Sequence, residues 1–320
     1  MSKTRENTTV GELPSMLEAG VDISKARLDV HFEGDEFHLP NTAAGVRRLL
    51  KILNLEDRPV RVSLEATGCY TRRLIVGCLE QGVPVSLLNA RSVRAFARAR
   101  GQLAKTDRID ARAIADYAPA FDPAVLDKGW PEREALQQLH KRLDGLIATR
   151  AQRRTSLEHY SEPSIRAEIK REITALGKRI ETYQNKIAAI IAQDAKLTAR
   201  QKAIRTITGV GEAVSTTLIV HFPELGDLNR KEAAALAGLA PMNRDSGAAR
   251  GRRTIQAGRS EPRKALYMAA LTAAHRNPMF TPFYKSLIHR GKPVKVALTA
   301  VARKLLVLVN STLKDIPQTT

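Results

Sequence analysis

Four acidic residues in the first third of the chain have the types and spacing to bind a divalent metal ion together. Asp22 and Glu65 each end an apolar, strand-like run, whereas Asp107 and Asp110 lie three residues apart in KTDRIDARAIADY, which places them on one face of a helix. Mg²⁺ prefers carboxylate oxygens and commonly binds a substrate phosphate as well, and Mn²⁺ accepts the same ligands. Two such ions about 4 Å apart would stabilise the attacking and leaving oxygens of a phosphodiester. The alternative for each acid taken singly is a solvated surface group.

The net charge indicates what the phosphate would belong to. The 320-residue chain carries 52 Lys and Arg against 33 Asp and Glu, a formal net charge of +19. So basic a protein is expected to bind nucleic acid. Aromatic residues make up only 4% of the chain, which argues against base stacking as the main mode of binding and favours contacts to the phosphate backbone.

Basic residues crowd the stretch that leads into the paired aspartates. A solvated charged helix face is the alternative, but their position beside the carboxylates favours a phosphate track into the metal site. The residues we expect to contact nucleic acid here are Arg91, Arg94, Arg98, Lys105 and Arg108.

A serine in the last third of the chain is a candidate nucleophile. Ser246 stands in an Asp-Ser-Gly loop followed by a run of arginines. A base or a metal would have to activate its hydroxyl, and arginines around it would hold the attacked phosphate. A plain turn explains Asp-Ser-Gly equally well, and Ser260 is a rival nucleophile that also suits a helix N-cap. The arginines expected to contact nucleic acid are Arg250, Arg252, Arg253, Arg259 and Arg263.

The segment IRTITGVGEAVSTTLI contains a further candidate for phosphate binding. Its Gly209-Val210-Gly211 turn between two apolar runs resembles a helix–hairpin–helix, in which backbone amides at the turn and at the next helix N-terminus bind a DNA phosphate. A Gly-x-Gly motif by itself is weak evidence for phosphate binding, because many packed helix pairs turn through glycine. Phosphate binding and simple packing therefore both stay open for Gly209 and Gly211.

Composition limits the cell compartment and the class of protein. With 43% hydrophobic residues, the chain can bury more than one core. It has no run of about 18 apolar residues that would suggest a membrane span, and its polar start lacks a signal-peptide core, so we expect a cytoplasmic protein. Cys69 and Cys78 are too few for a zinc motif or a disulfide framework, and we expect both to be reduced and buried.

Strands and helices must hold these candidate site residues in place. The pattern of apolar residues in the N-terminal third predicts an α/β domain at residues 18–128, after a polar tail at 1–17. Its elements run strand, strand, strand, helix, strand, helix, strand, followed by basic helices, which is the order expected of a ribonuclease-H-like fold. The expected strands are 19–24, 27–33, 35–40, 59–65 and 84–88, and the expected helices are 42–54 and 70–81.

The rest of the chain reads as helical. Residues 129–197 contain two apolar stripes with spacings of three and four, separated by a helix-breaking Ser161-Glu162-Pro163-Ser164. Two antiparallel helices packed on each other and an intermolecular coiled coil both fit this pattern. Residues 198–320 form a third, mainly helical region whose last helix, 294–313, is strongly apolar.

The combination of motifs resembles one family. GVDISK, LEATGCY and KTDRIDARAIADY look like the DEDD signature of the insertion sequence 110 family of transposases, and GVGEAVSTTLI, GLAP, DSGAARGRRTIQAGR and RKALYMAAL look like its C-terminal transposase domain. The match spans about residues 18–313. The segment from HRNPMF to the last helix suggests the insertion sequence 1111 subgroup.

The resemblance to this family implies a domain plan, partners and residue roles that the spacing of the acidic residues does not. It implies a RuvC-like N-terminal domain, a central coiled coil and a transposase domain, acting on DNA element ends and target under the direction of a structured noncoding guide RNA, the bridge RNA. By motif, Asp22, Glu65, Asp107 and Asp110 would bind Mg²⁺, and Ser246 would form a covalent phosphoserine link to DNA. The acids and the serine would meet in a composite site, with the protein acting as a homo-oligomer, a dimer or a tetramer.

Two other functions are compatible with the same residues. A RuvC-like nuclease that hydrolyses DNA with water would need the four acids but not Ser246. A non-catalytic nucleic-acid-binding protein with a degenerate nuclease fold would bind in a salt-sensitive way without needing Asp22 or Glu65.

Overall fold

The computed structural model describes residues 16–66, 68–102, 107–242, 254–255 and 257–316. The chain is mostly helical with one small mixed sheet, and it divides into two compact units, Met1–Pro131 and Glu132–Thr320. Each unit has its own hydrophobic core, so each is described by itself.

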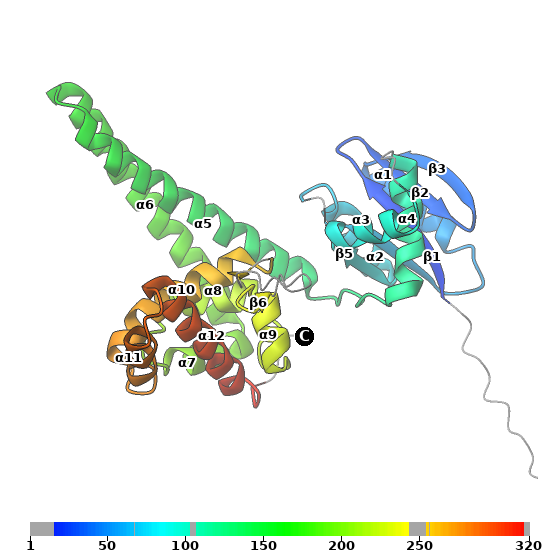
Figure 1. Cartoon of the computed structure of the whole chain (residues 1–320). Helices are drawn as coiled ribbons and strands as arrows, with labels where there is room; N and C mark the ends of the chain where they lie inside the picture. The colour runs from blue at the N-terminus through cyan, green and yellow to red at the C-terminus, as the bar shows by residue number, and fades with distance from the viewer. Residues whose placement is uncertain (1–15, 67, 103–106, 243–253, 256, 317–320) are drawn as a thin grey trace, which may run out of the picture. The chain divides into compact units, whose positions relative to one another are not determined.

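The first unit is built on a five-stranded sheet with the order β3-β2-β1-β4-β5 (Figure 1). The first three strands form an antiparallel meander, while β1 pairs with β4 and β4 with β5 in parallel. The strands are β1 (Leu17–Ile23), β2 (Arg27–Phe32), β3 (Asp35–Pro40), β4 (Val60–Glu65) and β5 (Val85–Leu88).

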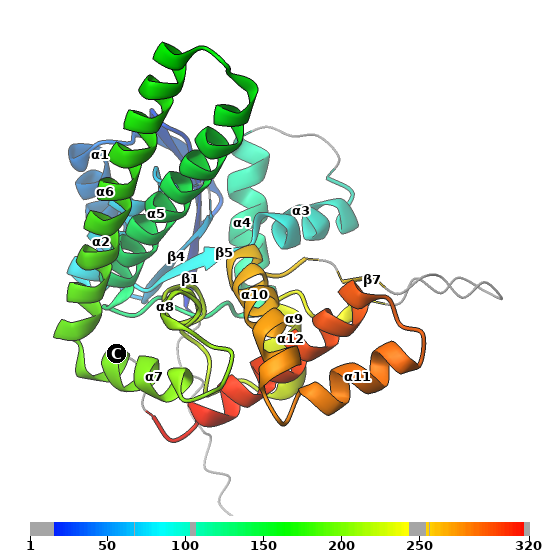
Figure 2. The same cartoon turned by 90° about the vertical axis from the view of Figure 1, so that its left-hand side faces the viewer.

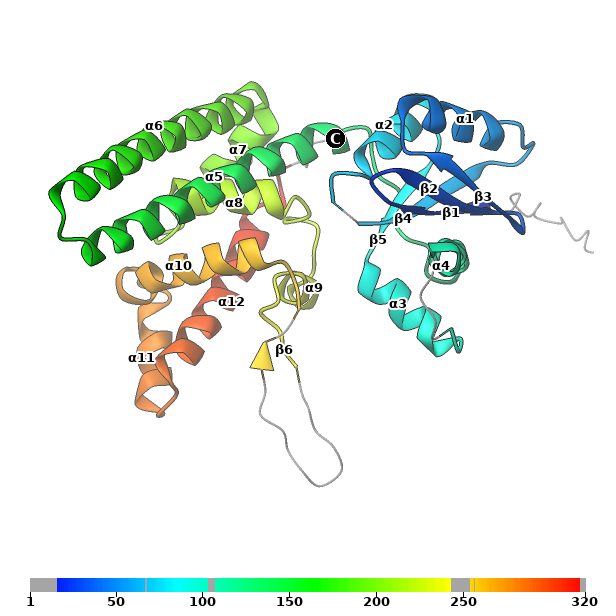
Figure 3. The ribbon, with the colours of Figure 1, turned by 90° about the horizontal axis from the view of Figure 1, so that it is seen from above.

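Helices cover both faces of this sheet. Figure 3 shows α1 and α2 on one face and α4 on the other, with α3 beside α4. Parallel strands need such crossover helices, which is why β4 and β5 are separated by α2. The helices are α1 (Ala43–Leu53), α2 (Arg72–Gln81), α3 (Ala90–Ala99) and α4 (Asp107–Phe121).

The two faces of the sheet differ in chemistry because side chains alternate along each strand. The face under α1 and α2 is apolar: Val21, Val62 and their neighbours at every second position join one core with Leu49 and Ile75. The opposite face, under α4, is polar. It carries Glu18, Gly20, Asp22, Asp29, His31, Arg61, Ser63, Glu65 and Ser86.

The predicted elements of this unit are confirmed to within two residues at each end, in the predicted order. The second hairpin turns through Glu33 and Gly34, both with positive φ, so β2 ends at Phe32, one residue before the predicted end of that strand. The expectation that both cysteines are buried was wrong for Cys69, which is exposed, and right for Cys78. Cys69 lies in the loop before α2, where the apolar periodicity of the helix does not extend.

The second unit begins with a long helical hairpin. Helix α5 (Trp130–Ser156) is followed by a short 3₁₀ turn, η1 (Leu157–His159), and by α6 (Pro163–Gln193), and the two long helices lie side by side and antiparallel (Figures 1 and 2). The predicted break before Pro163 is confirmed. Their seam is formed by Leu136, Leu143, Leu146, Ile180, Ile187 and Ile191.

The seam supports the antiparallel pairing of the two stripes within one chain. The second predicted stripe runs from Ile165 to Ile190 and drifts off the seam at its ends, since both of these residues are exposed while Ile191 is buried. A straight α-helix has 3.6 residues per turn, so a strict repeat of three and four rotates around it over many turns. Association between chains through this hairpin stays a prediction.

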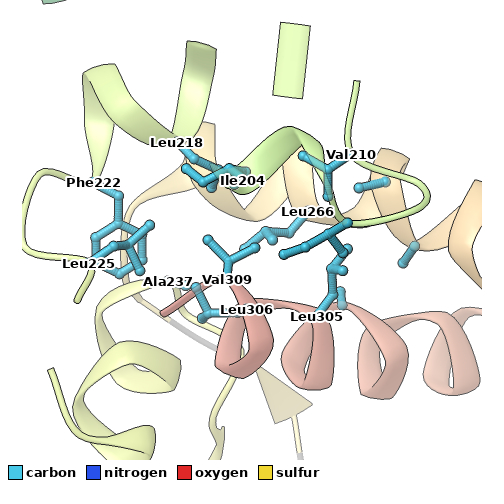
Figure 4. Packing of buried hydrophobic residues seen from close by; sticks show 14 of the residues in the cluster. Ile204, Val210, Leu218, Phe222, Leu225, Ala237, Leu266, Leu305, Leu306 and Val309 are labelled. Atoms are coloured by element: carbon cyan, nitrogen blue, oxygen red, sulfur yellow. The ribbon is translucent and has the colours of Figure 1, made fainter. Parts of the chain in front are cut away.

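The remaining helices of the second unit pack around a core centred on α12. In Figure 4, Leu305, Leu306 and Val309 of α12 face Ile204, Leu218 and Leu266 from three other helices, and Phe222 just after the end of one of them. The predicted core positions of the last helix are confirmed at Leu298, Val301, Leu305 and Val309, and Leu308 is partly buried. These helices are α7 (Ala195–Arg205), α8 (Glu212–His221), α9 (Arg230–Leu236), α10 (Ser260–Arg276), α11 (Thr281–His289) and α12 (Val294–Thr312).

Two short strands, β6 (Pro241–Met242) and β7 (Thr254–Ile255), pair antiparallel between α9 and α10. Together they bracket the segment that contains Ser246, which itself lies outside the described residues. Among the helices that the structure describes, none combines the length and the apolar character needed to cross a lipid bilayer.

Candidate functional site

Two of the predicted acids lie at the same edge of the sheet. Asp22 is the penultimate residue of β1 and Glu65 is the last residue of β4, and both are partly buried. The parallel register pairs Val21 with Leu64, so the two acids are the next residues along adjacent strands. In-register neighbours point to the same side of a sheet, which places both on the polar face.

The helix that carries the other two acids covers this face. A Cβ built at Gly20 would lie 2.2 Å from the carbonyl oxygen of Ala111 and 2.5 Å from the amide nitrogen of Ala115. Only glycine at this position lets α4 approach β1 so closely. Because Ala111 directly follows Asp110, the close approach brings the first turn of α4 to the strand that carries Asp22 two residues after Gly20.

The structure therefore brings β1, β4 and the start of α4 together as the metal-site hypothesis requires. Asp110 is partly buried, and the side chain of Asp107 lies outside the described residues although its backbone begins α4. Among the side chains that the structure describes, no three His, Cys, Asp or Glu residues form a group that could hold a metal ion. The four-carboxylate site stays a prediction that the backbone arrangement supports.

Ion pairs around the buried Arg61 stabilise the same face farther from the strand ends, with Glu18 buried beside it and Asp122 at the exposed edge. Arg61 Nη2 lies 2.6 Å from Glu18 Oε1, and Arg61 Nη1 lies 2.8 Å from Asp122 Oδ1. The same guanidinium donates to the carbonyl oxygen of Ala118 on α4. Burial raises the pKa of Glu18, and the hydrogen bond and charge of Arg61 partly oppose the rise. The network therefore ties α4 to β1 and β4.

Sequence reasoning missed one carboxylate beside the candidate site. Asp29 of β2 is the cross-strand partner of Asp22 and is only 7% exposed. Its Oδ2 accepts a 2.9 Å hydrogen bond from Arg27 Nε, so its charge is balanced within its own strand. The alternation of Arg27, Asp29 and His31 along β2 was the signal that could have placed it on the polar face.

The predicted basic track is partly described. Arg91, Arg94 and Arg98 lie on α3, which packs against α4 through Val93, Ala97 and Ile114. Arg91 and Arg98 are exposed and Arg94 is partly buried. Lys105 and the side chain of Arg108 lie outside the described residues. Helix α3 thus carries cations beside the helix of the paired aspartates, as a phosphate track would require.

The two glycines of the candidate helix–hairpin–helix lie in different surroundings. Gly209 has φ +104°, and a Cβ there would lie 3.0 Å from the backbone nitrogen of Ala273 on α10. Packing against α10 therefore accounts for Gly209. Gly211 is the N-cap of α8, and a Cβ there would meet no atom within 4 Å. Phosphate binding at the α8 N-terminus stays a prediction that rests on Gly211.

Arg259, the N-cap of α10 and four residues after the end of β7, is held by α8, by the turn that follows α8 and by α9. Its two terminal nitrogens bind both carboxylate oxygens of Glu224, at 2.7 and 2.6 Å, and one also donates to the carbonyl oxygen of His221. Its backbone amide donates to the carbonyl oxygen of Leu236 at 2.7 Å. Burial raises the pKa of Glu224, but Arg259 outweighs it and the net pKa is lowered. This guanidinium, predicted to contact nucleic acid, is already engaged by protein.

The structure describes some of the other predicted residues of this region and not others. Arg263 donates to the carbonyl oxygen of Ala257, next to Gly258. Ser260 is the first residue of α10 rather than its N-cap, which is Arg259. The N-cap reading of Ser260 was therefore wrong by one residue. Three predicted arginines lie outside the described residues, as Ser246 does: Arg250, Arg252 and Arg253.

Comparison with known proteins finds the same two regions. Residues 19–160 match the family DEDD_Tnp_IS110, described as "Transposase", and residues 201–285 match the family described as "Transposase IS116/IS110/IS902 family". The chain is 26% identical over 300 residues to the pilin gene-inverting protein of Moraxella bovis, covering 90% of this chain and 93% of that protein. The pilin gene-inverting protein of Moraxella lacunata matches with the same identity and coverage.

The two families match in the order that the sequence motifs predict, and each falls on an element of the candidate site. The first covers the sheet with Asp22 and Glu65 and the helix with Asp107 and Asp110, and the second covers β6, β7 and the segment between them. DNA is the partner that such an enzyme requires. The chain belongs to the IS110 family of transposases, and its activity is the transposition and recombination of DNA.

Proposed function

We propose that the protein excises and inserts its own insertion sequence by serine-dependent strand exchange, with Asp22, Glu65, Asp107 and Asp110 holding Mg²⁺ and Ser246 attacking DNA. The observation that carries the acid half of this proposal is the parallel register of β1 and β4. That register sets Asp22 beside Glu65 on the polar face, under the first turn of α4.

The donor set fits a hard divalent cation. All four residues offer carboxylate oxygens, which suit Mg²⁺ and Mn²⁺ better than softer metals. When bound, the metal would neutralise charge on the scissile phosphate and lower the pKa of a hydroxyl beside it. The protein's own contribution is to hold the acids on rigid strands and a helix, with Gly20 setting the distance between β1 and α4.

Ser246 would act as the nucleophile. In the proposed step its Oγ forms a bond to phosphorus, its proton passes to a base or to solvent, and one ester oxygen of the DNA leaves with the bonding electron pair. The phosphodiester is exchanged rather than hydrolysed, so a second DNA hydroxyl can reverse the step and join a new strand without another energy source. The arginines that follow Ser246 in the sequence would hold the phosphate.

The guide RNA and the oligomer belong to the same proposal. The resemblance to RNA-guided members of the family supports a structured noncoding RNA as the partner that specifies the target. The net charge of +19 suits a protein that holds two nucleic acids. Recombination cuts several strands in one complex, which supports a homo-oligomer, with the hairpin of α5 and α6 as the surface that joins the subunits.

A cleavage assay with denaturing analysis tests this function. Full-length protein is mixed with Mg²⁺, labelled donor and target DNA, and RNA transcribed from the flanks of the element. We expect a labelled protein–DNA adduct with wild type and none with Asp22→Ala or Ser246→Ala. Ser260→Ala is the matched control and should retain the adduct.

Two outcomes would contradict the proposal. Free cleaved DNA that survives Ser246→Ala but not Asp22→Ala would show a hydrolytic nuclease. Adduct formation that is unchanged in Asp22→Ala would remove the acids from the chemistry. To exclude failed folding, the circular dichroism spectrum and the unfolding midpoint of each variant are compared with those of wild type.

A further inference from the structure

A basic groove lies on the α1 and α2 side of the first unit, away from the polar face. It has a volume of about 770 Å³ and is lined by four cations against a single carboxylate, Glu80. The cations come from three separate segments: Lys25 from the turn after β1, Arg47 from α1, and Arg72 and Arg73 from the first turn of α2. None of these residues belongs to the predicted basic track on α3.

The groove is preorganised by one buried side chain. Asn41 is 5% exposed, and its Nδ2 donates to the carbonyl oxygens of Ser24 and Tyr70 at 2.9 and 3.2 Å. It therefore ties the turn that carries Lys25 to the loop before α2. Arg73 donates to the carbonyl oxygen of Asn41, which closes the connection between the two walls.

The floor of the groove is apolar and closely packed. A Cβ at Gly77 would lie 2.8 Å from Val46 Cγ1 and 3.3 Å from Leu50 Cδ1. Tyr70, which lines the rim, is 40% exposed. A groove with cations on its walls and an exposed aromatic ring on its rim combines the two features by which proteins bind single-stranded nucleic acid: phosphate neutralisation and base stacking.

The size and position of the groove select the form of nucleic acid. A volume of about 770 Å³ is typical of pockets that enclose small molecules, on the order of 300–1,000 Å³. It admits one or two nucleotides of a single strand, whereas a duplex would bridge over it. Lys25 comes three residues after Asp22, and Tyr70 comes five residues after Glu65, so two of the segments that line the groove directly follow the strand ends with the candidate acids.

We propose that this groove binds a single-stranded segment of nucleic acid, with phosphates on Lys25, Arg47 and Arg72 and a base stacked on Tyr70. The bound nucleic acid passes around the carboxyl ends of β1 and β4. One edge of the sheet then carries the candidate metal ligands on its polar face and holds the single-stranded nucleic acid on its apolar face. The proposal rests on the DNA-handling function of the family but not on the serine chemistry.

Two neighbouring arginines supply the test. Arg47 lines the groove, whereas Arg48 is also exposed on the same helix and does not line it. Fluorescence anisotropy of the full-length chain with short oligo(dT) and oligo(U) is measured over a series of KCl concentrations for Arg47→Glu and Arg48→Glu. We expect Arg47→Glu to weaken binding about tenfold more than Arg48→Glu, and to reduce the salt slope by about 0.7 for each phosphate that the variant no longer neutralises. Preference for one oligonucleotide identifies the strand as DNA or RNA.

A second pair of variants tests the stacking. Tyr70→Ala is compared with Tyr160→Ala, because Tyr160 is similarly exposed (43%) but lies after α5 in the other unit. Stacking predicts a loss of affinity on the order of tenfold for Tyr70→Ala alone. Photo-crosslinking with iodouracil-substituted oligonucleotides should modify the tryptic peptide 62–72, which contains Tyr70.

The proposal is overturned if the two arginine variants bind alike and peptide 62–72 carries no crosslink. Equal affinity for a mononucleotide and for an oligonucleotide would also overturn it, because the groove would then be a small-molecule site. The adduct assay separates this failure from the failure of the proposed function. If Ser246→Ala retains full adduct formation, the serine chemistry is wrong while the comparison of Arg47 with Arg48 still stands.

Discussion

Gly20 of β1 lies directly beneath the carbonyl oxygen of Ala111 on α4, at a distance that leaves no room for a side chain. Asp22 follows Gly20 by two residues on the same face of β1, and Asp110 precedes Ala111 by one. The position of one glycine therefore sets how near the helix of the paired aspartates comes to the strand of the first acid. It connects backbone packing to the arrangement of the candidate metal ligands.

Replacement of Gly20 by alanine should move α4 away from the sheet. The added Cβ would overlap with backbone atoms, which cannot rotate away as a flexible side chain can, and such overpacking costs about 1–3 kcal/mol. We expect Gly20→Ala to lower the free energy of unfolding in urea by that amount and to reduce adduct formation. Gly145→Ala is the control, because a Cβ at this position of α5 would meet no atom within 4 Å. Unchanged stability of Gly20→Ala would contradict the close approach.

The buried pair of Glu18 and Arg61 should be costly to break from one side. Arg61→Met leaves the Glu18 carboxylate buried without its partner, and removal of one member of a buried pair costs about 3–5 kcal/mol. The double variant Glu18→Gln/Arg61→Met should recover part of that loss, because the only charge then left without its partner is that of Asp122, which is exposed to water. Urea unfolding of the two single variants and the double variant gives the coupling. Additive losses would show that the pair does not act as a unit.

The stability of the second unit should fall in mild acid through His221. Burial, followed by the charge of His140, lowers the pKa of His221 to about 4 from its ordinary 6.5, although Glu261 and Asp144 oppose the shift and Arg259 adds to it. The folded state thus binds fewer protons than the unfolded state between these values. The stability that the neutral His221 contributes to the folded state is therefore fully present above pH 6.5 and is lost as the pH falls toward 4.

The size of this effect is on the order of 3 kcal/mol if His221 were the only group involved. Urea unfolding at a series of pH values should show a shallower dependence between pH 6.5 and 4.5 for His221→Gln than for wild type. The exposed His289 of α11 provides the control, and His289→Gln should follow wild type. An identical pH dependence for all three proteins would refute the assignment.

Arg259 should act on the chemistry by positioning rather than by touching DNA. If its contact with Glu224 fixes the start of α10, and through it the chain that leads back to Ser246, then Arg259→Gln and Glu224→Gln should lower adduct formation alike, and the double variant should be no worse than either. A direct DNA contact predicts a different pattern, in which Arg259→Gln weakens DNA binding and lowers its salt slope while Glu224→Gln leaves both unchanged. Anisotropy with duplex DNA and the adduct assay together distinguish the two roles.

Much of the first unit could be predicted from sequence because apolar and polar residues alternate clearly along its strands. The run VRVSLE of β4 places Val60, Val62 and Leu64 on one face and Glu65 on the other, and the periodicity of α1 is equally plain. The order of these elements then indicates the kind of sheet they form. What local patterns could not supply was Gly20, whose role depends on a helix that begins almost ninety residues later.

Other parts of the site were beyond sequence reasoning for the same physical reason. Arg259 stands in an arginine-rich run that looks like a nucleic-acid surface, and nothing local reveals that Glu224 takes its guanidinium. The basic groove is assembled by residues from three segments, so no single stretch of sequence shows its charge. Asn41, which connects those segments, is an ordinary polar residue in sequence and a buried connector in the fold.

Mapping the residue linked to DNA tests the central claim most directly. Trypsin should cut after Arg244, Arg250, Arg259 and Arg263, so that Ser246 falls in the peptide DSGAAR and the rival Ser260 in the peptide SEPR. The adduct is formed with wild-type protein, digested with nuclease and trypsin, and analysed by mass spectrometry. We predict that DSGAAR carries the nucleotide remnant. A remnant on SEPR, or cleaved DNA with no modified peptide, would contradict the assignment of Ser246 as the nucleophile.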